Sequence, residues 1–109
     1  MTRHLNRFII PRVEPELIRK LDIQQRTLFR QLVFKQNASS ITEICRLLNA
    51  GERTVREKIK KWIEEGFLEP KDPEAQRIRT IVLSVQYEEL AVDIRNESEK
   101  YQYLLGSND

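Results

Sequence analysis

The stretch ITEICRLLNAGERTVREKIKKWIEEGFLEP, residues 41–70, decides the fold that the sequence predicts. Apolar residues recur in it at spacings of three and four positions, which is typical of amphipathic helices. The pattern is interrupted at 49–51 and stops before Gly66, a residue type that commonly ends helices. We therefore expect two helices, at 41–48 and 52–65, joined by a short turn.

Local signals support these boundaries. Ser40 is followed three residues later by Glu43. This is the arrangement of a capping box, in which each side chain satisfies the other residue's backbone N–H. Residues 37–40 are expected to form a loop that ends in this cap. In the turn between the helices, we expect Gly51 to adopt a backbone conformation that other residues avoid.

The rest of the chain adds an arm, two strands and two more helical segments. We expect, in chain order, an N-terminal arm at 1–15, a helical pattern over 16–36 with a break near Asp22, a short strand at 67–69, a strand at 77–85 and a long helix within 86–109. In the second strand, alternation predicts that Ile81, Leu83 and Val85 share one face.

Two helices joined by a short turn, followed at once by a β-hairpin, define a winged helix-turn-helix. The expected fold class is mainly α with a small β-hairpin (α+β). It would form a winged helix-turn-helix domain at 16–85, with an additional C-terminal helix at 86–109. A chain of 109 residues is long enough for one such domain with one core.

The composition is that of a globular protein, with 39% hydrophobic and 33% charged residues. No apolar run approaches the roughly 20 residues that cross a bilayer, and a single cysteine excludes an internal disulfide, so we expect a cytoplasmic protein without membrane contact. The net charge of +2 is unevenly distributed. Residues 1–38 carry 8 Lys/Arg against 3 Asp/Glu, whereas residues 86–109 carry 2 against 6. This asymmetry indicates that one side of the protein meets a polyanion.

The sequence argues against an enzyme. It has no Gly-rich phosphate loop and no Cys/His pair at metal-ligand spacing, and its one histidine and one cysteine are His4 and Cys45. We therefore expect no metal and no other cofactor. Cys45 falls on the buried side of its helix, so we interpret it as a core residue rather than as an oxidant sensor.

The helix predicted at 52–65 carries the residues that point to DNA. At about 100° per residue, its apolar positions form one side and its charged positions project from the other. In a helix-turn-helix, the N-terminal half of the second helix enters the major groove, where Arg pairs with guanine and Glu accepts from cytosine. The residues of this helix that we expect at DNA are Arg53, Thr54, Arg56, Glu57, Lys58, Lys60 and Lys61.

Further candidates flank this helix. Hydroxyls at the start of the preceding helix can donate to phosphate, although they can equally serve as caps. These are Ser39, Ser40 and Thr42. The expected wing at 70–79 adds Lys71, Gln76, Arg77 and Arg79. An ordinary solvated helix face would also explain such charges, but their place on the recognition helix of an independently predicted fold favours DNA contact.

The stretch 41–68 resembles the helix-turn-helix of bacterial winged-helix regulators, notably in Thr54-Val55 and in WIEEGFL at 62–68. The segments 71–77 and 81–84 are similar to the wing of the MarR/SarA group. Together the resemblance covers roughly residues 24–105.

One position departs from that family. The family's wing carries an Asp-x-Arg pair, with a Leu-Thr at the end of the next strand. Here Arg77 stands at the Arg position and Leu83-Ser84 at the Leu-Thr position, whereas Ala75 replaces the Asp. The carboxylate that would hold Arg77 is therefore missing from the wing.

The resemblance implies a homodimer that places two recognition helices in successive major grooves of a pseudo-palindromic site. The dimerisation residues that we expect form one stripe of the C-terminal helix: Tyr87, Leu90, Ile94, Tyr101 and Leu105. The alternative is that this stripe packs on the domain's own first helix. The basic N-terminal arm could reach a minor groove or have no role.

The function that we expect is sequence-specific binding of double-stranded DNA by a dimeric transcriptional regulator. Two alternatives fit the same sequence. One is a winged-helix module that binds an acidic protein. The other is a DNA-binding accessory factor in plasmid or phage replication or segregation.

Overall fold

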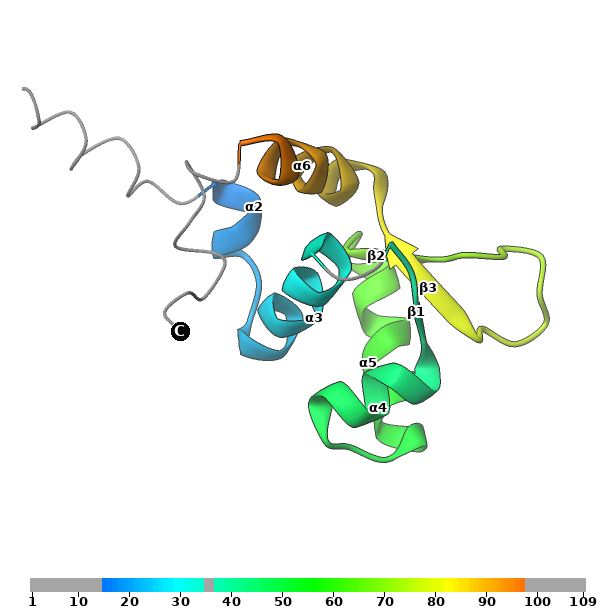
Figure 1. The fold of residues 1–109 in the computed structure, drawn as a ribbon. Coiled ribbons are helices and arrows are strands. Elements are labelled where there is room, and N and C mark those ends of the chain that lie inside the picture. The colour runs from blue at the N-terminus through cyan, green and yellow to red at the C-terminus, as the bar shows by residue number, and fades with distance from the viewer. Residues whose placement is uncertain (1–14, 35–36, 98–109) are drawn as a thin grey trace, which may run out of the picture.

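The computed structural model describes residues 15–34 and 37–97, and this part of the chain contains five helices and a small three-stranded antiparallel sheet (Figure 1). The elements are α2 (Glu16–Arg19), α3 (Ile23–Phe34), β1 (Ser39–Ser40), α4 (Ile41–Leu48), α5 (Glu52–Glu64), β2 (Leu68–Pro70), β3 (Thr80–Leu83) and α6 (Val85–Asn96). The prediction of a mainly helical α+β chain is confirmed. Of the N-terminal arm predicted at 1–15, all but Pro15 lies outside the described residues.

The sheet contains one strand more than the predicted hairpin. β2 pairs with β3 as expected, with Leu68 opposite Leu83. On the other edge of β3, Ser39 pairs with Ile81 and Ser40 with Thr80, so the strand order is β1-β3-β2. The prediction of a loop over 37–40 is therefore wrong at its last two residues. A two-residue strand has no alternation to detect, and only the nearness of β3 makes these serines a strand.

Two capping boxes fix where helices begin. Ser40 Oγ accepts from the Glu43 backbone N–H at 3.1 Å, and Glu43 Oε1 accepts from the Ser40 N–H at 2.9 Å, which confirms the predicted cap of α4. Asp22 and Gln25 make the same reciprocal pair at 2.8 and 3.0 Å. This second box starts α3 afresh after α2, which explains the break that the sequence predicts near Asp22.

The turn between α4 and α5 uses a different residue from the one predicted. Gly51 has an ordinary φ of −75°, and the left-handed conformation belongs to Asn49, with φ 53° and ψ 52°. The prediction for Gly51 is wrong because asparagine, whose short polar side chain tolerates this region, already ends α4. Gly66 has φ 82° and follows Glu65, the C-cap of α5, so it lies at the end of this helix as expected.

The second predicted strand is shorter than expected. Ile81 and Leu83 are buried, as their alternation predicts, but Val85 is 66% exposed and is the first residue of α6. The prediction that Val85 shares their face is therefore wrong. Ser84 intervenes, and its hydroxyl donates to the Gly66 carbonyl at 2.7 Å, so the strand ends at Leu83, two residues earlier than predicted.

The core connects α5 to neighbouring elements through aromatic side chains. Val55, Ile59 and Trp62 are almost fully buried on one side of α5, in agreement with the predicted apolar stripe. Phe67 packs edge-to-face between Trp62 and Tyr87, at centroid distances of 6.0 and 5.1 Å. Edge-to-face pairs of this kind are favourable beyond the area that they bury.

The helices and the long loop occupy different sides of the molecule. In Figure 1, α2, α3 and α6 lie towards one side, α4 and α5 form the lower part, and the loop between β2 and β3 projects away from all of them. We call this segment, residues 71–79, the β2–β3 loop. The arrangement leaves α5 beside the loop and on the side away from α2.

The two glycines beside α5 give a matched test of the fold. Gly66→Ala is expected to destabilise the protein by about 1–2 kcal/mol, because a left-handed φ strains a residue with a Cβ atom. Gly51→Ala should change stability by less than about 1 kcal/mol, since its φ is ordinary and its added Cβ would meet nothing within 4 Å. Urea unfolding measures both, and equal effects would contradict these backbone assignments.

Candidate nucleic-acid interface

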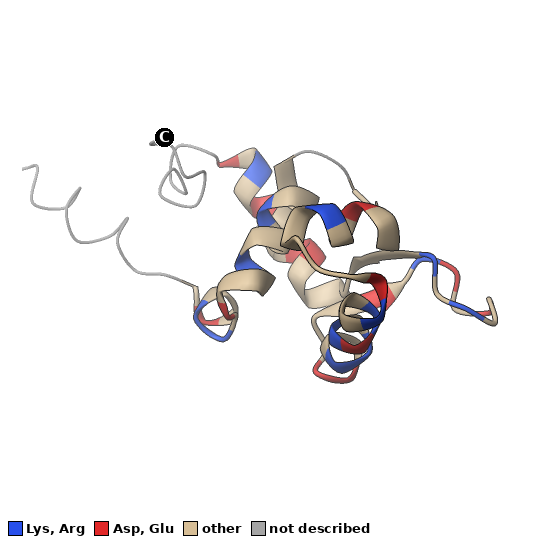
Figure 2. Ribbon diagram, turned by 90° about the horizontal axis from the view of Figure 1, so that it is seen from below, with Lys and Arg blue, Asp and Glu red and all other residues tan. Residues whose placement is uncertain are grey.

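The outer face of α5 is exposed in the part of the chain that the structure describes. It lies opposite the buried Val55–Ile59–Trp62 stripe, as the sequence predicts. Arg53 has a 94% exposed side chain, and its only close ionic contact among the described residues is Glu57 at 3.8 Å. The exposed residues of the face are Arg53, Thr54, Glu57, Lys60, Lys61 and Glu64. Figure 2 shows positions of both charge signs along this helix and also in the neighbouring loop.

Arg56 is placed differently from the prediction. Its side chain is only 26% exposed, because Nε donates to Glu52 Oε2 at 2.7 Å and Nη1 donates to the Ile78 carbonyl at 2.7 Å. The prediction that Arg56 points outward with Arg53 is therefore wrong. Arg56 instead ties α5 to the end of the β2–β3 loop. Lys58 is also only half-exposed, on the flank of the helix.

Glu52 supplies the carboxylate that Ala75 cannot offer to Arg77. Its Oε2 accepts from Arg56 and also from Arg77 Nη2 at 3.0 Å, so one oxygen joins the first turn of α5 to the loop. The hydrogen bond and charge of Arg56, reinforced by Arg77, hold the pKa of Glu52 below its ordinary value of 4.5. Arg77 is thus fixed even though Ala75 stands where the resembling family has an aspartate.

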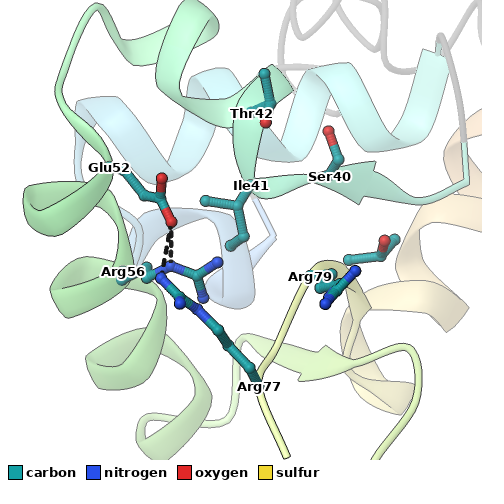
Figure 3. A pocket seen from close by; sticks show the side chains of 8 residues that line it. Ser40, Ile41, Thr42, Glu52, Arg56, Arg77 and Arg79 are labelled. Carbon is teal, nitrogen blue, oxygen red and sulfur yellow. Dashed lines mark hydrogen bonds and ion pairs between the residues drawn. The ribbon is translucent and has the colours of Figure 1, made fainter. Parts of the chain in front are cut away.

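An open depression lies between the start of α4, the start of α5 and the end of the β2–β3 loop (Figure 3). Its volume is about 510 Å³. In Figure 3, Arg79 lies across the Ile41 side chain from the cluster formed by Glu52, Arg56 and Arg77. The lining residues are Ser40, Ile41, Thr42, Glu52, Arg56, Arg77, Arg79 and Thr80.

The three hydroxyl residues predicted to contact phosphate, Ser39, Ser40 and Thr42, differ in exposure and in hydrogen bonding. Ser39 is 2% exposed and its hydroxyl donates to Glu43 Oε1 at 3.4 Å, so its predicted DNA contact is wrong. Ser40 lines the depression, but its hydroxyl oxygen is occupied by the cap of α4. Thr42 is exposed and also lines the depression. Of the three, only Thr42 combines exposure with a place in the depression and no capping role.

The β2–β3 loop presents basic residues along an ordered backbone. Lys71, Gln76, Arg77 and Arg79 are all exposed. The Lys71 N–H donates to the Thr80 carbonyl at 2.9 Å, which closes the base of the loop. Backbone and side-chain acceptors of Asp72 order its first turn through the N–H groups of Ala75 and Glu74, at 3.2 and 3.1 Å.

The described part of the predicted dimerisation stripe, Tyr87, Leu90 and Ile94, is covered from within the chain. Tyr87 and Ile94 are buried and Leu90 is half-buried in the core. Tyr87 packs on Phe29 of α3 and donates its hydroxyl to the Leu17 carbonyl at 3.0 Å. Between the two readings that the sequence left open, packing on the chain's own helices therefore accounts for these three side chains. Tyr101 and Leu105 lie outside the described residues, as does His4.

Two further observations, on metal ligands and on membrane spans, concern residues 15–34 and 37–97. No group of three or more His, Cys, Asp or Glu side chains is arranged to hold a metal ion there. None of the helices in this part is long and apolar enough to cross a membrane. Cys45 is a free thiol that packs against the core while half-buried.

Comparison of the chain with protein-family models, with curated proteins and with solved structures gave no match. What this chain does must therefore be inferred from its own geometry and chemistry.

Glu52 is the residue of the candidate site that the sequence did not identify. The spacing of Glu52 and Arg56, four positions apart on a helix, is a signal for their ion pair. The contact of Glu52 with Arg77, however, joins positions 25 residues apart and depends on how the loop folds back on α5. No local pattern could have identified it.

The Glu52 cluster predicts a particular pH dependence. The pKa of Glu52 is lower in the folded chain than its ordinary value of 4.5. The ionised carboxylate therefore stabilises the fold at a pH above 4.5, and this stabilisation is lost as the pH falls through the folded-state pKa. The difference in unfolding free energy between the native chain and Glu52→Gln should therefore shrink on acidification. Glu57→Gln, which disrupts only an exposed pair, is the control and should show little difference at any pH.

Nuclear magnetic resonance titration of the Glu52 carboxyl carbon checks the cause directly. Its pKa should rise in Arg56→Gln, and by less in Arg77→Gln, because Arg56 makes the larger contribution. An unchanged carboxyl pKa in both variants would show that the cluster does not form in solution.

Proposed function

We propose that this chain binds double-stranded DNA as a winged helix-turn-helix protein. In this proposal α4, the Asn49 turn and α5 form the helix-turn-helix, α5 enters the major groove, and the β2–β3 loop is the wing. The element order and the antiparallel pairing of β2 with β3 support this reading of the fold. The biological role that we propose is transcriptional regulation.

The observation that carries the proposal is the side-by-side placement of two basic segments. Arg77 from the loop and Lys60 from α5 line one shallow groove, together with Arg53, Arg56, Glu52 and Glu57. A helix that presents exposed cations beside a second basic element can follow one strand of a duplex from a groove to its backbone. The apolar stripe of α5 is fully used in the core, so these polar residues are the surface that α5 offers.

The residues of the outer face divide by chemistry. Arg53, on the second position of α5, is the proposed reader of a guanine edge, and Glu57 can accept from cytosine one turn later. Lys60 and Lys61 are proposed to hold phosphate, which adds affinity without sequence choice. Arg56 has no such role, because its donors face Glu52 and Ile78.

The carboxylates on this face favour sequence-selective binding over simple charge attraction. Glu57 and Glu64 are exposed among the cations of α5. Acidic groups repel a phosphate backbone wherever they lack a specific donor to meet. We therefore expect a clear preference among duplex sequences, which selection from a random DNA pool would identify. A symmetric selected site would support the homodimer as well.

Arg53→Ala and Lys60→Ala test the proposal. Loss of a paired contact to a base should weaken binding of the selected duplex by about 1–3 kcal/mol for Arg53→Ala. For Lys60→Ala we expect a nearly uniform loss across duplex sequences, since a phosphate contact carries no sequence choice. Both variants should keep the native unfolding midpoint, because these side chains are exposed on α5.

The matched control is Arg19→Ala, which removes a cation from α2, away from the proposed interface. Fluorescence anisotropy measures each affinity. No binding of any duplex at low salt would refute the DNA proposal, and binding to an acidic protein surface through the same residues would take its place.

A further inference from the structure

The depression between α4, α5 and the β2–β3 loop has an excess of positive charge. Arg56, Arg77 and Arg79 line it, and Glu52 is the only acidic side chain among the described residues of its lining. These arginines come from α5 and from the end of the loop, so the chain folds to bring like charges together. Such an arrangement is unfavourable unless an anion or solvent compensates it, which makes the depression a candidate for an anionic ligand.

Most donors of two of these arginines are unused. A guanidinium has five N–H donors. Arg77 gives one nitrogen, Nη2, to Glu52, and Glu52 shares that same acceptor oxygen with Arg56. The Arg79 guanidinium has no hydrogen-bond or ion-pair partner within residues 15–34 and 37–97. The depression therefore offers several charged donors that the protein itself does not satisfy.

One backbone hydrogen bond and one ion pair position the residues of the depression. The Arg79 carbonyl accepts from the Ile41 N–H at 2.9 Å, which fixes the end of the loop against the first residue of α4. Arg77 is fixed through Glu52. Thr42, the second residue of α4, is exposed on the same depression and adds a hydroxyl near the positive end of a helix dipole.

We infer that this depression is a phosphate-binding site, in which Arg77 and Arg79 clamp one phosphate group and the Thr42 hydroxyl donates to it. The inference rests on the proposed function, because the phosphate would be a group of the DNA backbone. Arg77 lines both this depression and the groove beside α5, so a strand that leaves the face of α5 meets the site next. Arginine suits this role because its planar donors match two oxygens of a phosphate.

The salt dependence of duplex binding is the main test. The plot of log K against log salt has a negative slope, and each lost phosphate contact makes this slope shallower by about 0.9 for a duplex. Arg79→Gln should therefore reduce the slope by about that amount, and Arg19→Gln, which removes the same charge from α2, should leave it unchanged. Thr42→Val, which keeps the side-chain shape, should weaken binding without altering the slope.

A second measurement uses inorganic phosphate without DNA. Titration followed by ¹H–¹⁵N spectra should shift the Thr42 amide and the Arg79 side-chain signal in the native chain, and the shift of the Thr42 amide should disappear in Arg79→Gln. Sodium chloride at equal ionic strength is the control. Arg79→Gln is expected to keep the native unfolding midpoint, since its side chain is exposed and makes no hydrogen bond or ion pair among the described residues.

The outcomes separate this inference from the proposed function. An unchanged slope in Arg79→Gln, while Arg53→Ala still weakens duplex binding, would overturn the phosphate site and leave the DNA proposal standing. Saturable phosphate shifts in a chain that binds no duplex would support an oxyanion site and refute the DNA proposal. The absence of both duplex binding and phosphate shifts would overturn both.

Discussion

The packing of Phe67 between Trp62 and Tyr87 is the contact on which the arrangement of the molecule depends. These rings connect α5, the residue before β2 and α6, and Tyr87 continues the contact to Phe29 on α3. Trp62, together with the buried Val55 and Ile59, sets the rotation of α5 about its own axis. That rotation decides which residues of α5 face solvent. The apolar contacts of the core and the charges of the surface are therefore two results of one constraint.

The sequence was sufficient for those parts of the fold that have a period or a cap. The apolar spacing of α5 identified its buried side, and Ser40 with Glu43 located the start of α4. It was insufficient where a short segment takes its conformation from a distant partner. Ser39–Ser40 is a strand only because Thr80 and Ile81 lie beside it, and Val85 leaves the sheet because Ser84 bonds to Gly66.

The same distinction applies to the candidate site. Periodicity separated the exposed Arg53 from the buried Val55, because both follow from the helix alone. It failed for Arg56, which lies at the border of the two sides. There the neighbouring loop decides whether a side chain is solvated, and the Ile78 carbonyl and Glu52 draw the guanidinium inward. Border positions of a helix are thus the ones that sequence periodicity assigns least well.

The hydrogen bond from Ile41 N–H to the Arg79 carbonyl has a mechanical consequence. β1 passes directly into α4 without an intervening loop, so this bond and the pairing of β1 with β3 join the base of the β2–β3 loop rigidly to the helix pair. Glu52 adds a contact from α5 to the same loop, through its ion pair with Arg77. Under the proposed function, these contacts would set the distance between α5 and the β2–β3 loop. A duplex would then be chosen partly by the width of its groove, a property of DNA shape that no single side chain reads.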